Sequence, residues 1–110
     1  CGSTVSVQIK ARDGRVTEFG QDVKACALGQ AAASVLGANV IGRSRDELAR
    51  ARDELRAMLK EDGPVPAAPF DGFEVLRPAR DYKNRHASIL LSLDATLAAF
   101  DELEAAARQG

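Results

Sequence analysis

The chain has 110 residues, of which 45% are hydrophobic and 28% are charged, and we expect a single domain over residues 1–110 that forms a core without a disulfide or a metal. No apolar run reaches the roughly 20 residues that a membrane span requires, so we expect a soluble protein with no membrane partner. A net charge of −1, with one Tyr, four Phe and no Trp, provides no basic or stacking surface and argues against nucleic-acid binding.

A β-hairpin is predicted at the start of the chain. Apolar and polar residues alternate over residues 4–10, as in a strand with one face on a core. Asp13 and Gly14 follow, and Asp-Gly between two strand-like runs is typical of a two-residue type I′ turn, which requires positive φ at both positions. We therefore expect a return strand over about residues 16–23.

The return strand alternates less regularly than the first. Val16 and Phe19 would fall on opposite faces of a regular strand, although both are apolar. A β-bulge or a local twist would remove this conflict, and we expect one near Gly20.

Three later segments have helical periodicity. Residues 25–40 carry many small residues and an apolar stripe, which predicts a helix packed closely on the sheet. Ser44 and Glu47 have the spacing of a capping box and predict the start of a second amphipathic helix. A third, long amphipathic helix is predicted from about His86.

The connection before the last helix is expected to lack regular structure. Residues 63–69 include three prolines, which predicts a surface loop. Residues 70–80 read as short and irregular, with few periodic apolar positions. The whole pattern predicts an α+β fold, in which a small antiparallel sheet has helices packed on one face.

The two cysteines lie at opposite ends of the predicted hairpin. If Asp13 and Gly14 are the turn residues, Cys1 lies directly opposite Cys26, with Cα atoms about 4.5 to 5.5 Å apart. That distance fits a disulfide and fits two ligands of one metal equally well. Two thiols are too few for a secreted disulfide framework and favour a cytoplasmic location.

Cys26 stands where a strand is expected to run into a helix. Backbone N–H groups at a helix N-terminus lower the pKa of a thiol and favour the thiolate, which is the form that binds metal or attacks sulfur. The alternative is that Cys26 is a small buried apolar residue and Cys1 is incidental.

His86 is the only histidine, and it is predicted to lie where the last helix begins. From there its side chain could reach the end of the sheet and act as a ligand. It could equally be a helix cap or a surface residue, with Asp81, Tyr82 and Arg85 nearby.

Four features in this order resemble the IscU/SufU/NifU-N family of iron–sulfur cluster assembly scaffolds: "CGST", the Asp-Gly hairpin, "KACALGQAAASVLG" and "RHASILLSLDATL". The resemblance covers nearly the whole chain. It implies that the family's N-terminal helix and first strand would lie upstream of Cys1. The segment "LRPARDYKNR" resembles the insertion before the last helix of the SufU branch.

The resemblance also implies a binding site for zinc, iron or a nascent iron–sulfur cluster. Cys1, Cys26 and His86 would be its ligands, with Ser3 and Ser88 as further candidates. Ser3 stands where the family has an aspartate. The family's third cysteine is replaced by Ala87 in one alignment and by Ser88 in the other.

The family's function and partners then carry over as expectations. The chain would be a scaffold or carrier, not an enzyme, and its partners would be a cysteine desulfurase and other iron–sulfur assembly proteins. One alternative is a zinc-dependent sulfurtransferase like SufU, with Cys26 as the persulfide acceptor. The other is an interaction module that has lost its metal.

Overall fold

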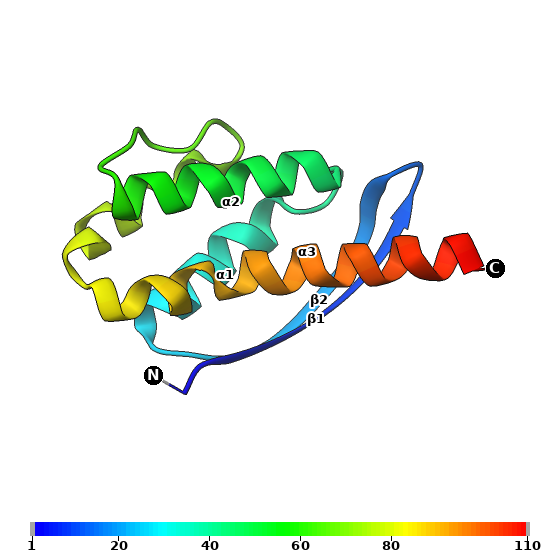
Figure 1. Cartoon of the computed structure of the whole chain (residues 1–110), viewed down its shortest axis with the longest axis horizontal. Helices are drawn as coiled ribbons and strands as arrows, with labels where there is room; N and C mark the ends of the chain where they lie inside the picture. The colour runs from blue at the N-terminus through cyan, green and yellow to red at the C-terminus, as the bar shows by residue number, and fades with distance from the viewer. Residues whose placement is uncertain (1, 110) are drawn as a thin grey trace.

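The computed structural model describes residues 2–109 (Figure 1). The strands are β1 (Thr4–Arg12) and β2 (Arg15–Lys24), the α-helices are α1 (Ala27–Asn39), α2 (Arg45–Lys60) and α3 (His86–Gln109), and the 3-10 helices are η1 (Phe70–Asp81) and η2 (Lys83–Arg85). The strands form a two-stranded antiparallel sheet, and the helices lie on one side of it. The predicted α+β fold is confirmed. Among the described residues, no helix is both long and apolar enough to cross a membrane.

The core lies between the sheet and the helices. Helix α3 packs on β1 and also contacts α1 and α2, so it is the central helix of the bundle. Large, fully buried side chains of this core come from α1, α2, η1 and α3; they include Leu36, Leu55, Phe73, Leu93 and Phe100. The start of β1, the start of α1 and the start of α3 all lie at the same end of the molecule (Figure 1).

The hairpin turns where the sequence predicts, since Asp13 and Gly14 have φ values of 54° and 77°. Its register nevertheless changes close to the turn. Ala11 pairs with Val16, but Lys10 pairs with Glu18, so one extra residue of β2 is inserted. The predicted bulge therefore exists, but two or three residues nearer to the turn than Gly20.

The position of the bulge has a simple cause. With the extra residue between them, Val16 and Phe19 both turn towards the helices, whereas Thr17 and Glu18 are exposed. Beyond it, every pair is shifted by one residue, as far as Thr4 with Lys24. The direct pairing predicted for the two cysteines assumed an unshifted register, and that register is wrong. Cys1 lies outside the described residues, so its distance from Cys26 stays a prediction.

The N-terminus of α2 has the predicted capping box. The Ser44 hydroxyl accepts a hydrogen bond from the Glu47 N–H at 3.2 Å, and the Glu47 carboxylate accepts one from the Ser44 N–H at 3.2 Å. This arrangement satisfies two of the amide groups that a helix start leaves without partners.

The connection between α2 and α3 is only partly as predicted. Residues 62–67 have no regular structure, in agreement with the proline-rich sequence. The segment after them was predicted to be irregular, and this is wrong, because it forms η1. Its buried side chains recur every third residue, which is the period of a 3-10 helix; they are Phe70, Phe73, Leu76 and Ala79. Through them, η1 packs against α1 and α2.

Candidate functional site

Cys26 is the N-cap residue of α1, between the end of β2 and the first helical turn. The pKa of its thiol is lowered from 9.0 to about 7. The main cause is the backbone N–H of Gly29 at the helix N-terminus, followed by the hydroxyl of Ser88. The Leu28 N–H and the positive charge of Arg85 act in the same direction, against partial burial. About half of the Cys26 thiol is therefore ionised at pH 7, far more than for an ordinary cysteine.

Two serine hydroxyls join Cys26 from other parts of the chain. Ser88 lies in the first turn of α3, and its Oγ is 3.7 Å from the Cys26 sulfur. Ser3, just before β1, has its Oγ 2.8 Å from that of Ser88. When Cys26 is a thiolate, the Ser88 hydroxyl can donate a hydrogen bond to the sulfur and accept one from the Ser3 hydroxyl.

Gly29 allows α1 and α3 to approach closely enough for this contact. A Cβ atom at Gly29 would lie 2.7 Å from the Ala25 Cβ and 2.8 Å from the Ser88 Oγ. Both distances are shorter than real contacts allow. The small-residue composition of α1 thus brings Ser88 to Cys26, which links the sequence of the helix to the chemistry of the thiol.

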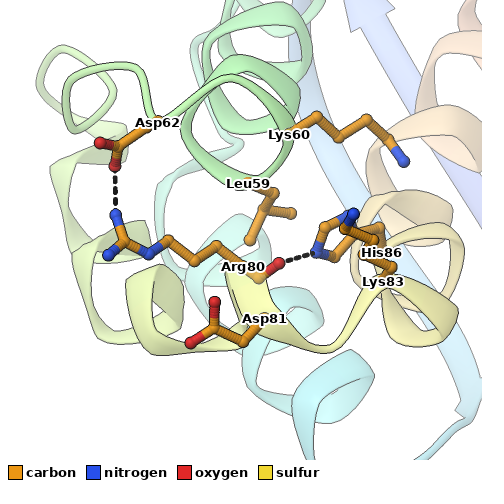
Figure 2. A pocket seen from close by; sticks show the side chains of 7 residues that line it. All are labelled: Leu59, Lys60, Asp62, Arg80, Asp81, Lys83 and His86. Atoms are coloured by element: carbon orange, nitrogen blue, oxygen red, sulfur yellow. Dashed lines mark hydrogen bonds and ion pairs between the residues drawn. The ribbon is translucent and has the colours of Figure 1, made fainter.

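His86, two residues before Ser88, faces another part of the molecule. It is only 2% exposed, and its Nε2 lies 3.1 Å from the carbonyl oxygens of both Ala79 and Arg80. Two carbonyl acceptors require Nε2 to carry the proton. Figure 2 shows His86 in a pocket with Lys60 and Asp62, where Arg80 forms an ion pair with Asp62. Cys26 does not line this pocket.

Of the ligands predicted, the structure brings together Ser3, Cys26 and Ser88. Cys1 lies outside the described residues. The contacts of His86 do not bring it to Cys26, so its role as a metal ligand remains a prediction that the geometry does not support. Within residues 2–109, no three His, Cys, Asp or Glu side chains are grouped so that they could hold a metal ion.

The position next to Cys26 is occupied by Ser88. Its neighbour Ala87 is exposed, whereas Ser88 is 7% exposed and contacts the thiol. This geometry favours the alignment in which Ser88 stands where the family's third cysteine would be.

Two hollows open beside Cys26 and share both Cys26 and Arg85. The first has a volume of about 440 Å³ and is also lined by Lys24 and Gln30. The second has a volume of about 300 Å³ and is also lined by Leu28 and by Tyr82, which is 58% exposed. Lys24 and Gln30 were not predicted as site residues, and their proximity to Cys26 along the chain is the one signal that could have indicated them.

Comparison with known proteins gave results from solved structures only. No family model matches the chain, and no curated protein matches it. A crystal structure described as a nitrogen-fixing NifU-like protein (N-terminal) from Brucella abortus is 54% identical, with a TM-score of 0.91, and the match covers 94% of this chain and 72% of that one. A second structure, described only as a hypothetical protein, is 22% identical over 92% of this chain and 74% of its own length, with a TM-score of 0.82, and it supports the fold alone.

Proposed function

This chain belongs to the NifU-like family of iron–sulfur cluster assembly proteins, and from that premise we propose that it is a carrier that holds its cargo at the Cys26 thiolate. The cargo would be iron, zinc or a nascent iron–sulfur cluster. Its partners would be a cysteine desulfurase and other assembly proteins, and we place it in the cytoplasm. The observation that carries this proposal is the position of the Cys26 thiol at the N-terminus of α1, with the hydroxyl of Ser88 3.7 Å from its sulfur.

The ligand set explains why a carrier is favoured over a permanent metal site. A tetrahedral zinc site needs four N, S or O ligands, and among residues 2–109 only one thiol and two hydroxyls converge. Neutral hydroxyls are poor ligands for zinc or iron. Cargo at Cys26 would need a further ligand, either Cys1 or a group from a partner, and it would leave when that group is withdrawn.

A second candidate function, sulfur transfer, rests on the lowered pKa of Cys26. In this reaction the Cys26 thiolate attacks the outer sulfur of a persulfide on a cysteine desulfurase. A new S–S bond forms at Cys26, and the S–S bond of the donor breaks. The donor cysteine leaves as a thiolate, so no other oxidant or reductant is needed.

Metal analysis and mass spectrometry of the same preparation separate these functions. The chain, purified without chelators, is analysed for iron, zinc and acid-labile sulfide, next to Cys26→Ser and Cys1→Ser variants. We expect substoichiometric metal that Cys26→Ser abolishes. An added sulfur atom on the Cys26 peptide after incubation with a desulfurase, with zinc as the only bound metal and no acid-labile sulfide, would favour the zinc-dependent sulfur transfer.

If the starting protein, Cys26→Ser and Cys1→Ser all contain the same amount of metal, the carrier proposal is wrong. If the chain binds no metal, accepts no sulfur and still binds assembly proteins, it is a metal-free interaction module.

A further inference from the structure

The surface around Cys26 carries two positively charged side chains that have no carboxylate from residues 2–109 beside them. Apart from the Cys26 thiolate, the only charged residues that line the two hollows are Lys24 and Arg85, and within the described residues neither makes an ion pair with a carboxylate. The carboxylates closest to them in sequence, Asp22 and Asp81, line other pockets. The cleft that contains Cys26 is therefore cationic at one end.

The other end of this cleft is apolar. Leu28 is half-buried there, and Tyr82, the only tyrosine of the chain, is 58% exposed. Tyrosine and arginine are enriched among the residues that contribute most to protein–protein binding, because both combine apolar area with a polar end. Arg85 links the two ends, since it lines both hollows.

We propose that this Cys26 cleft, formed by Lys24, Cys26, Leu28, Tyr82 and Arg85, is the docking surface for an acidic segment of a partner protein that carries an apolar side chain beside its carboxylates. The carboxylates would face Lys24 and Arg85, and the apolar side chain would fill the hollow between Leu28 and Tyr82. This inference rests on the proposed function, because a carrier must be approached at Cys26 by the group that delivers or receives its cargo.

A polypeptide fits the cleft better than a small anion does. Cys26 and Arg85 line both hollows, whose volumes are about 440 and 300 Å³, so a single carboxylate or phosphate bound in the first would leave the apolar hollow empty. A segment with both kinds of side chain would occupy both hollows and cover the thiolate. It would also exclude water from the site of exchange, which strengthens the charge pairing.

The test uses three synthetic peptides of equal length as probes, titrated into the ¹⁵N-labelled, reduced, metal-free chain and followed by NMR. The first is Asp-Glu-Phe-Asp-Glu, the second replaces its acids by the amides Asn and Gln, and the third replaces Phe by Ser. We expect the first peptide to shift the amides around Cys26 and Arg85, and the other two to bind at least about threefold more weakly.

Matched variants locate the binding. Lys24→Gln and Arg85→Gln are each expected to weaken the first peptide by about threefold, with a smaller dependence on salt. Tyr82→Ser should weaken it by a similar factor. The controls are Lys60→Gln, an exposed cation elsewhere, and Val75→Ser, whose side chain is 69% exposed; neither should change binding.

Several outcomes would overturn the proposal. The first is equal binding of the amide peptide, and the second is shifts that map away from Cys26. The third is equal binding by reduced glutathione that Tyr82→Ser leaves unchanged, which would indicate a small acidic thiol as the occupant. Concentration-dependent shifts at the cleft without peptide would indicate a second copy of the chain as its occupant.

The Cys26→Ser variant separates this proposal from the proposed function. Docking through charge and apolar contact needs no thiol, and Cys26→Ser removes a negative charge from the cleft, so this variant should bind the first peptide at least as tightly as the starting protein does, while it loses metal or sulfur. Docking without any loading at Cys26 in the starting protein would disprove the carrier function alone. Loading at Cys26 without docking would disprove the docking surface alone.

Discussion

The first turn of α3 supplies two polar side chains, two residues apart, to opposite sides of the helix. His86 points to η1 and is held by the carbonyl groups of Ala79 and Arg80. Ser88 points to α1 and contacts the thiol of Cys26. Because successive residues of a helix are rotated by about 100°, residues at i and i+2 cannot face the same partner.

The two sides of α3 therefore have different functions. On the first side, Nε2 of His86 attaches α3 to the segment before it, and the ring lines a pocket with Lys60 and Asp62. On the other side, the buried Ser88 hydroxyl contacts the Cys26 thiol and lowers its pKa. A single histidine in a chain is thus no evidence for a metal site until its packing is known.

The largest effect is expected from His86→Ala. The substitution removes a buried ring and the donor shared by two carbonyl groups, so it should lower the free energy of unfolding by about 2–4 kcal/mol. Urea denaturation measures this loss. Lys83→Ala, an exposed neighbour that lines the same pocket, is the control and should change stability by less than about 0.5 kcal/mol.

The same variant can contradict the comparison. If His86→Ala keeps its stability but loses bound metal that the starting protein holds, His86 is a ligand and the contrast between the two sides of α3 is wrong.

On the Cys26 side, Gly29→Ala should destabilise the fold by about 1–3 kcal/mol, because the new methyl group would collide with Ala25 and Ser88. It should also raise the pKa of Cys26 by pushing Ser88 away. Gly37→Ala, in the same helix, is the control for helix propensity. Its Cβ would lie 3.3 Å from the flexible Gln21 side chain, so this change should be neutral or slightly stabilising. Equal destabilisation by both would refute a specific role of Gly29.

A smaller effect is expected from Ser88→Ala on the thiol itself. Loss of the hydroxyl should raise the pKa of Cys26 from about 7 by roughly half to one pH unit. The rate at which iodoacetamide alkylates the Cys26 peptide, measured against pH by mass spectrometry, should have its midpoint near pH 7 in the starting protein and higher in the variant.

The sign of the pH dependence follows from the lowered pKa. The stabilisation that the thiolate gives the fold is complete above pH 9.0, and it is lost as the pH falls through about 7.

The control for the Ser88→Ala alkylation experiment is Ser92→Ala. Ser92 is a buried serine one turn further along α3, and its replacement should leave the alkylation profile unchanged. An unchanged midpoint in Ser88→Ala would show that the helix N-terminus alone lowers the pKa.

The smallest effect is expected from Ser3→Ala. Ser3 contacts Ser88 at 2.8 Å, so it acts on the thiol through that hydroxyl. Its removal should raise the pKa of Cys26 by less than the removal of Ser88 does, in the same alkylation assay. A larger effect from Ser3→Ala than from Ser88→Ala would mean that Ser3 meets the thiolate directly.

The sequence by itself determined the features that depend on neighbouring residues. The Asp-Gly turn, the capping box of Ser44 and Glu47 and the amphipathic helices are all encoded within a few positions along the chain. The lowered pKa of Cys26 was also predicted, because the strand-to-helix junction was visible in the sequence. These local signals, together with the order of the motifs, were sufficient for the α+β fold and the family.

Only the tertiary structure decided the register of the hairpin and the partners of Cys26. Both Gly20 and the residues after Val16 could have held the bulge, and packing of Val16 and Phe19 against the helices selected the latter. His86 and Ser88 lie so close in sequence that either could have been assigned to the thiol. Because they are two residues apart on α3, their side chains point to opposite sides of the helix. The contact of His86 with η1 and the close approach of α1 at Gly29 decide that Ser88, and not His86, reaches the thiol.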